Sequence, residues 1–171
     1  MIDMRYMDTH VILAYGFEKD PNHEKAVELV DKSIGDPFTS PYTLVELYCT
    51  VSRKIDRYYI PGFDFLEIDD ETKARVIVEY SIRLLGLRIC ADDISAKRIK
   101  ELDVDIFSAY LDAISLAPRL RMPTGDTIHI VYASRFHNGQ KAKSLLTLDS
   151  HFHERKDAIE KETGILILTV T

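Results

Sequence analysis

Short apolar runs alternate along the chain with stretches in which apolar residues recur at helical spacing. Such runs, rich in β-branched and other aliphatic residues, are typical of strands that are buried on both faces. They predict strands at Met4–Met7 and at residues 37–40 (PFTS), 87–90 (LRIC), 143–149 (KSLLTLD) and 164–170 (GILILTV).

The stretches between these runs predict helices. The clearest one, residues 40–55, begins with Ser40 as N-cap and Pro41 at the first helical position, and it places Leu44, Tyr48, Val51 and Ile55 on one stripe. Further helices are predicted at Thr9–Phe17, Glu24–Lys32, Glu71–Leu85, Ile94–Leu102, Ile106–Ala117, Thr127–His137 closed by Asn138 and Gly139, and His153–Glu160.

Short strands that alternate with helices indicate an α/β fold, in which helices cover both faces of a mostly parallel sheet. The pair of helices at Ile94–Leu102 and Ile106–Ala117 could form a hairpin. With the helix before them, they make residues 53–120 resemble a helical insert. The expected organisation is a single domain over residues 1–171 that contains this insert.

The composition of the chain excludes several classes of protein. A chain of 171 residues with 46% hydrophobic content can bury one sizeable core, and a formal charge of −6 argues against a large basic surface for nucleic acid. Cys49 and Cys90 form no CxxC pair, so we expect core-filling thiols and a reducing compartment. Without a long apolar segment or a signal-peptide pattern, the expectation is a cytoplasmic protein with no membrane partner.

Four acidic residues follow strands in this arrangement. Asp8 ends the first strand and Asp149 ends the strand LLTLD, while Glu46 and Asp126 lie in the first turns of helices that follow PFTS and PTG. The carboxyl ends of parallel strands meet at one edge of the sheet, where ligands bind. Four clustered carboxylates repel one another unless a divalent cation is held there, and oxygen ligands favour Mg²⁺ or Mn²⁺ over zinc.

Each of these residues also has an ordinary structural interpretation. Asp8 could be a helix N-cap, Asp126 could interact with the helix dipole, and Asp149 could begin a turn. By the helical period, Glu46 lies opposite the apolar stripe, although Val45 and Cys49 beside it suggest partial cover. His129, one turn after Asp126, is expected to orient its neighbours by hydrogen bonds rather than to bind metal.

Taken together, MDTHVIL, the Glu46 of TLVELY, the Asp126 of TGDTIHIVYA and the TLD that ends at Asp149 resemble a PIN domain over residues 4–54 and 120–171. The resemblance implies a three-layer α/β/α sandwich and a metal-dependent nuclease, like the VapC-type toxins of toxin–antitoxin pairs. It also implies that Asp8, Glu46, Asp126 and Asp149 form the acidic site, and that Thr147 supplies the hydroxyl of a T-x-D pattern.

The expected function is therefore hydrolysis of single-stranded RNA with Mg²⁺ or Mn²⁺. The alternatives are a PIN scaffold that binds RNA or protein without cutting, and a phosphate-accepting signalling domain. The expected partners are a second copy of the chain, bound through residues 53–120, and an antitoxin. Local phosphate contacts could come from basic residues near the acids, namely Arg53, Lys54, Arg57, Arg119 and Arg121.

Overall fold

The computed structural model describes residues 3–91, 94–100, 102–135 and 142–170. Five parallel strands form one sheet in the order β3-β2-β1-β6-β7. These strands are β1 (Met4–Met7), β2 (Asp36–Thr39), β3 (Arg88–Ile89), β6 (Ala142–Leu146) and β7 (Leu166–Leu168). The central strand, β1, pairs with β2 and β6, so Tyr6 lies beside Phe38 on one side and Leu145 on the other.

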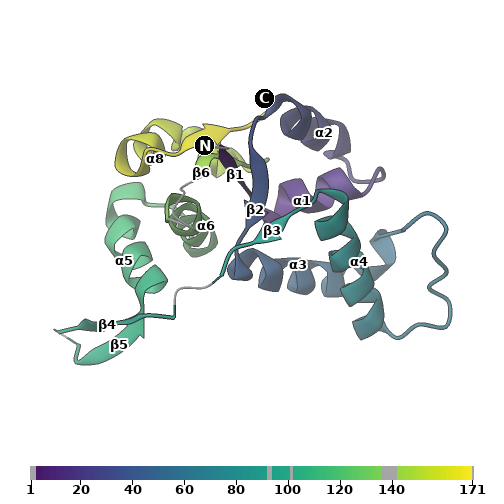
Figure 1. Cartoon of the computed structure of the whole chain (residues 1–171), viewed down its shortest axis with the longest axis horizontal. Helices are drawn as coiled ribbons and strands as arrows, with labels where there is room; N and C mark the ends of the chain where they lie inside the picture. Colours follow the sequence, from purple (N-terminus) through teal and green to yellow (C-terminus); the bar gives the residue numbers. More distant parts are fainter. Residues whose placement is uncertain (1–2, 92–93, 101, 136–141, 171) are drawn as a thin grey trace.

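Helices cover both faces of this sheet (Figure 1). On one face lie α1 (Thr9–Gly16), α2 (His23–Lys32), α3 (Pro41–Arg53) and α4 (Asp70–Leu84). On the other face lie α5 (Ser108–Leu120), α6 (Thr124–Ser134) and α8 (Lys156–Thr163), with the short α7 (Ser150–Glu154) after β6. The predicted three-layer α/β/α sandwich with a mostly parallel sheet is therefore confirmed.

Side chains that alternate along the strands divide the core into two halves. Tyr6 and Leu145 contribute to the half that contains residues of α5, α6 and α8, whereas Met7 and Leu146 contribute to the half under α1, α3 and α4. All four side chains are fully buried. This two-residue period is what a sheet covered on both faces requires, because successive side chains point to opposite faces.

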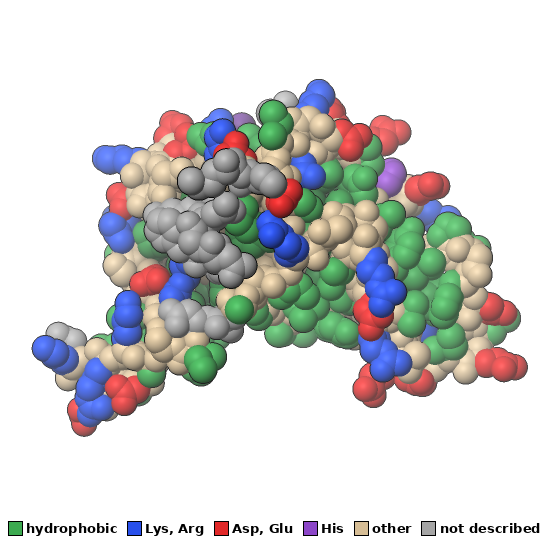
Figure 2. Space-filling model, in the orientation of Figure 1, with side chains coloured by type: hydrophobic (Ala, Val, Ile, Leu, Met, Phe, Trp, Pro, Cys, Tyr) green, Lys and Arg blue, Asp and Glu red, His purple; other side chains and the backbone are tan. Residues whose placement is uncertain are grey.

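The predicted helix at Ile94–Leu102 is wrong. Instead, the strands β4 (Ala96–Ile99) and β5 (Val104–Phe107) pair in an antiparallel arrangement, which extends away from the layers in Figure 1. Val104 and Ile106 of β5 alternate with Asp103, just before the strand, and Asp105, which is a two-residue period. Arg98 on β4 forms ion pairs with Asp103 and, at 3.2 Å, with Asp105. Charged side chains of both signs cover the hairpin in Figure 2.

Residues 53–120 therefore include more than helices. β3 joins the main sheet beside β2, α4 packs against α1 and α3, and α5 packs against α6. A short 3-10 turn, η1 (Ile55–Arg57), follows α3. The buried Ile77 of α4 and Leu120 of α5 belong to the two halves of the core. The helices of this region thus complete the layers on both sides of the sheet.

Other boundaries differ in detail from the sequence predictions. Helix α6 begins at Thr124, and its predicted end at Asn138 and Gly139 lies outside the described residues. The predicted helix through His153 to Glu160 is two helices, α7 and α8, joined at Arg155. Among the described residues, no helix has the length and apolar character needed to cross a membrane.

Candidate functional site

All four sequence-predicted acids reach one cavity at the carboxyl ends of β1 and β6. The cavity has a volume of about 220 Å³. Its walls come from α1, α3, α6 and the start of α7, and they include Asp8, Thr9, His10, Glu46, Thr50, Arg53, Asp126, His129, Asp149 and Phe152. Acids that lie up to 141 positions apart in the sequence, Asp8 and Asp149, therefore face the same small space, as predicted from their places at the strand ends.

Asp8 combines a structural role with a place in this cavity. It is the N-cap of α1, because its Oδ1 accepts a hydrogen bond of 2.9 Å from the backbone N–H of Val11. Its side chain is almost completely buried, and this burial raises the pKa of the carboxyl. The positive charges of His129 and His10 and a hydrogen bond from Thr147 act in the opposite direction. The cap and site interpretations of Asp8 are thus compatible.

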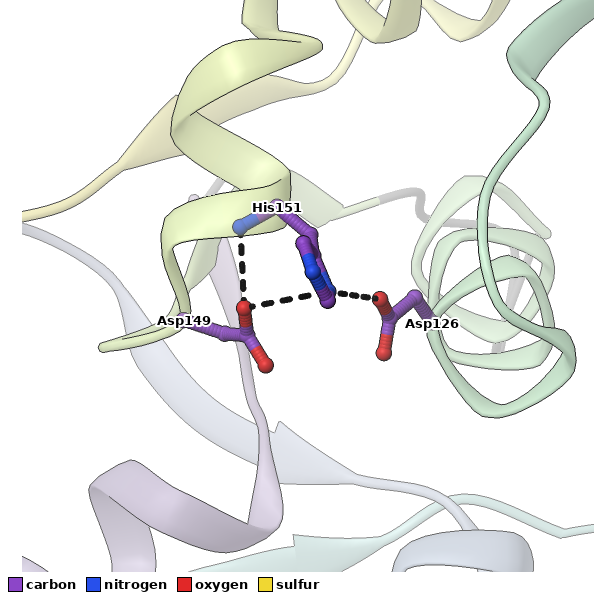
Figure 3. A group of neighbouring side chains, drawn as sticks. All are labelled: Asp126, Asp149 and His151. Carbon is purple, nitrogen blue, oxygen red and sulfur yellow. Dashed lines mark hydrogen bonds and ion pairs between the residues drawn. The ribbon is translucent and has the colours of Figure 1, made fainter.

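Asp126 and Asp149 face each other across the side chain of His151 (Figure 3). The Nδ1 atom of His151 lies 3.5 Å from Asp126 Oδ2 and 3.5 Å from Asp149 Oδ1. The backbone N–H of His151 donates a hydrogen bond of 2.9 Å to Asp149 Oδ1. Burial and then the negative charge of Asp149 raise the pKa of Asp126. The two carboxylates are therefore close enough to repel each other.

Glu46 is held by a buried network that starts on β1. Its Oε2 accepts hydrogen bonds from Thr9 Oγ1 at 2.7 Å and from His129 Nε2 at 2.8 Å. The other ring nitrogen of His129 lies 2.9 Å from the hydroxyl of Tyr6, which also contacts Thr43 Oγ1 at 2.7 Å. His129 therefore orients its neighbour through hydrogen bonds, as expected from the sequence.

This network keeps Glu46 ionised. Burial opposes the negative charge, but the hydrogen bond and positive charge of His129 and hydrogen bonds from Thr9 and Tyr42 outweigh it, and they lower the pKa of Glu46 to about 2. Gly125 leaves room for this arrangement, because a Cβ atom there would lie 3.0 Å from the Tyr42 hydroxyl and 3.5 Å from Glu46 Oε1. The site thus contains one carboxylate of low pKa and two, Asp8 and Asp126, of raised pKa.

The surroundings of Glu46 differ from the sequence interpretation. The buried stripe of α3 consists of Thr43, Leu47 and Val51, while Val45 is 61% exposed and Cys49 is exposed. Glu46 itself is partly covered, with a side chain that is 31% exposed, but Val45 and Cys49 do not provide this cover. The prediction of a core-filling thiol at Cys49 is wrong, whereas Cys90 is buried as predicted. Glu46 lies on the edge of the buried stripe, in the second turn of α3.

Thr147 does not line the cavity, but its side chain forms hydrogen bonds with two residues that do, Asp149 and Asp8. Its hydroxyl is fully buried and accepts a hydrogen bond of 3.0 Å from the backbone N–H of Asp149. The same side chain forms a hydrogen bond with Asp8 that lowers the pKa of that carboxyl. One hydroxyl therefore connects the two strand ends that carry Asp8 and Asp149.

Of the five basic residues considered from the sequence, the structure places only Arg53 at this cavity. Arg57 lines a different cavity of about 410 Å³, between α1, α2 and α4. Arg119 forms an ion pair of 2.5 Å with Glu162. Lys54 and Arg121 are exposed residues at the ends of α3 and α5, and neither lines the acidic cavity.

The donors present fit a divalent cation. Four carboxylates supply the hard oxygen ligands that Mg²⁺ and Mn²⁺ prefer. Among the described side chains, Asp126 Oδ2 is a buried oxygen that accepts no hydrogen bond. One oxygen each of Asp126 and Asp149 and one ring nitrogen of His151 lie within 4.8 Å of one another. A cation would satisfy the buried oxygen and offset the repulsion between the two carboxylates.

His151 is the residue of this cluster that sequence reasoning missed. The sequence offered a signal, because Asp149 and His151 form a D-x-H pattern directly after a buried strand. An N-capping Asp accepts a hydrogen bond from the backbone two residues on, and this fixes the position of the following side chains. Hard oxygen ligands at the strand ends point to carboxylates only, so this histidine was not among the predicted residues.

Comparisons with known proteins agree with this fold. The sequence matches the PIN domain family over residues 5–158. One similar structure, Mycobacterium tuberculosis VapC20, described as a sarcin-ricin loop cleaving toxin, is 16% identical with a TM-score of 0.54, and the match covers 88% of this chain and 93% of that one. Another is VapBC2 from Rickettsia felis bound to a DNA fragment from their promoter, 15% identical with a TM-score of 0.53, covering 97% of this chain and 98% of that one. Such low identities show a shared fold. A comparison with curated proteins finds no match.

Proposed function

The chain belongs to the PIN domain family, and from this premise we propose that it is an endoribonuclease that hydrolyses phosphodiester bonds of single-stranded RNA and depends on Mg²⁺ or Mn²⁺. The observation that carries the proposal is the meeting of four acidic side chains in one cavity of about 220 Å³. The repulsion among four carboxylates destabilises the fold unless a cation is bound. The same cation can take part in hydrolysis of a phosphodiester.

Each residue of the cavity has a role in this proposal. Asp8, Asp126 and Asp149 would hold the ion, and Glu46 would hold it directly or through water. When bound, the divalent cation supplies positive charge that activates water and offsets charge on the phosphate oxygens. Thr147 fixes the strand ends that carry Asp8 and Asp149 through the hydrogen bonds described above.

Two further side chains have roles in this proposal: Arg53 binds the substrate, and His129 orients Glu46. The Arg53 guanidinium lines the cavity and is exposed, so it is placed to bind a phosphate and to offset the repulsion of RNA by an acidic protein. His129 keeps Glu46 ionised and oriented, because it donates to Glu46 Oε2 from Nε2 while its Nδ1 is occupied by the Tyr6 hydroxyl.

The likeness to two VapC structures supports a role as the toxin of a toxin–antitoxin pair. In this proposal an antitoxin protein suppresses the activity, and a second copy of the chain binds through residues 53–120. Residues 1–171 act as a single PIN-like domain, in which residues 53–120 are the insert, and the protein works in the cytoplasm.

Cleavage of a fluorescently labelled single-stranded RNA tests the proposal. We expect cleavage with Mn²⁺ or Mg²⁺, none in EDTA, and none by the Asp8→Asn variant. Asp157→Asn is the matched control, because it makes the same change at an exposed carboxylate on α8. Calorimetric titration of metal into wild type and Asp8→Asn measures binding separately. Activity that persists in EDTA, or equal cleavage by Asp8→Asn, would contradict the proposal. RNA binding without cleavage would favour a non-catalytic scaffold.

A further inference from the structure

His151 contacts two acids of the cavity, Asp126 and Asp149, yet the four-carboxylate interpretation gives it no role. We propose that the imidazole of His151 is a ligand of the same ion, and that this nitrogen makes the site select Mn²⁺ over Mg²⁺. The inference rests on the proposed function, because it assumes that Asp126 and Asp149 hold a divalent cation. It departs from the expectation of a purely oxygen-lined site.

The positions of the three donor atoms support this assignment. His151 Nδ1 is equidistant from Asp126 Oδ2 and Asp149 Oδ1, at 3.5 Å from each. Two ligands about 2.1 Å from an octahedral ion are separated by about 3.0 Å when adjacent and about 4.2 Å when opposite. The observed distances fall between these limits. The ring in Figure 3 reaches between the two acids, which come from α6 and from the end of β6.

The backbone holds His151 in this place. Asp149 is the N-cap of α7, and its Oδ1 accepts the backbone N–H of His151 at 2.9 Å. The side chain of His151 is 54% exposed, but its ring nitrogen approaches both carboxylates. A ring with this much freedom could point into solvent, but in the structure its Nδ1 lies between the two acids.

Other histidines near the cavity are less suited to bind the ion. His129 uses both ring nitrogens, one with Glu46 at 2.8 Å and one with Tyr6 at 2.9 Å. His10 lines the cavity but does not belong to the group of donors that lie within 4.8 Å of one another. Among the described residues, His151 is thus the nitrogen donor that the geometry assigns to this cluster.

An imidazole ligand changes which metal is favoured. Mg²⁺ is a hard cation that prefers oxygen ligands and retains its waters, whereas first-row transition metals accept imidazole nitrogen readily. A site with two carboxylate oxygens and one nitrogen therefore discriminates against Mg²⁺ more strongly than a site with oxygen donors only. The alternative is that His151 is a positively charged counter-ion, which the metal must displace.

Metal binding by the full chain separates these two roles. Mn²⁺ binding is measured from the electron paramagnetic resonance signal of free Mn²⁺, Mg²⁺ binding by calorimetry, and bound nitrogen by pulsed paramagnetic resonance. The variants are His151→Ala, His151→Asp and the matched control His153→Ala. His153 is a neighbouring histidine on α7 whose Nδ1 contacts Thr169 Oγ1 at 3.2 Å, and it does not belong to the group of donors that contains Asp126 and Asp149.

We expect His151→Ala to lower the Mn²⁺ affinity by about tenfold or more and the Mg²⁺ affinity by less than about threefold, and to remove the nitrogen coupling to Mn²⁺. His151→Asp, which replaces nitrogen by oxygen, should bind both ions with a smaller preference for Mn²⁺. His153→Ala should match the wild type in every measurement.

Two results would overturn the inference while leaving the nuclease proposal intact. One is tighter or unchanged Mn²⁺ binding by His151→Ala, which is the behaviour of a displaced counter-ion. The other is a nitrogen coupling that persists in that variant, since another histidine would then be the ligand. A wild-type protein that binds neither Mn²⁺ nor Mg²⁺ would overturn the proposed function itself.

Discussion

Replacing Asp126 by Asn should stabilise the metal-free protein while it abolishes cleavage. Asp126 and Asp149 present carboxylate oxygens within 4.8 Å of each other, and burial and the charge of Asp149 raise the pKa of Asp126. Asn keeps the size of the side chain and removes its charge. The substitution therefore relieves a repulsion that exists in the folded state and is weak in the unfolded chain.

The size of the effect follows from competing terms. At 4.8 Å, the upper limit of the separation between these oxygens, two like charges repel by about 3.5 kcal/mol at an effective dielectric constant of about 20, and by about 0.9 kcal/mol at about 80. The two side chains are 17% and 27% exposed, and His151 offsets part of the charge, which favours the lower value. Loss of a negative charge near the N-terminus of α6 costs about 0.3–1 kcal/mol. The net gain is about 0.5 kcal/mol, which raises Tm by about 1–2 °C.

Metal should reverse this gain in stability, and low pH should remove it. A cation at about 100 times its dissociation constant stabilises the wild type by about 2.7 kcal/mol, so the wild type should then melt above the variant. Because the folded-state pKa of Asp126 lies above the ordinary value of 3.8, wild-type stability falls as pH rises through the interval between them. The advantage of Asp126→Asn is therefore full at pH 7 and shrinks as the pH falls through the raised pKa.

Differential scanning fluorimetry in EDTA and in Mn²⁺, from pH 7 downward, measures all of these differences. Asp157→Asn again serves as the control, because this exposed carboxylate lies in the first turn of α8 but outside the cluster, so it should lose only the interaction with the helix dipole and lower Tm slightly in either condition. A Tm of Asp126→Asn in EDTA at pH 7 that is several degrees below the wild type would refute the reasoning. It would show that interaction with the helix dipole outweighs the repulsion.

Two further predictions concern the Glu46 network and the oligomeric state. In His129→Asn, the pKa of Glu46 should rise from about 2 toward its ordinary 4.5, followed by carbon-13 NMR of the carboxyl, and cleavage should weaken. In the wild type, ionised Glu46 contributes stability above pH 4.5, and this stability is lost only as the pH falls toward 2. The variant should lack this contribution. An unchanged Glu46 pKa would contradict the role of His129. Light scattering at micromolar concentration should give about twice the 19.6 kDa chain mass, because α5 and the hairpin expose Phe107, Tyr110 and Ile114; a mass near 19.6 kDa would rule out a stable dimer.

The elements that place the acids could be predicted because their signals are local and strong. Ser40 and Pro41 mark the start of α3, and Ser40 Oγ accepts the backbone N–H of Thr43 at 3.1 Å. The strands around Asp8 and Asp149 are short, apolar and followed by capped helices. A parallel sheet then brings the ends of β1 and β6 together without further information.

The hairpin of β4 and β5 could not be recognised in the same way, because its sequence fits both the helical period of 3.6 residues and the two-residue period of a strand. Ile99 and Leu102 are spaced as on a helix, while Val104 and Ile106 alternate as in a strand. Strand pairing prevails through the left-handed backbone of Asp103, at φ of 53°, and the contacts of Arg98 across the two strands. Ion pairs between exposed strands are individually weak and depend on which residues face each other, so they leave no clear mark on sequence periodicity.

Glu46 illustrates why part of the site lay beyond the sequence. Helical period placed it opposite an apolar stripe, and on α3 it does lie outside the buried Leu47 and Val51. What holds it in the cavity is a contact with His129, 83 residues later, whose ring is fixed in turn by Tyr6 on the central strand. An amphipathic pattern indicates only which side of one helix faces solvent. It gives no information about contacts with residues far away in the sequence. A polar residue at the edge of such a pattern is a candidate for a buried network whenever a following strand and helix bring another polar side chain to the same edge of the sheet.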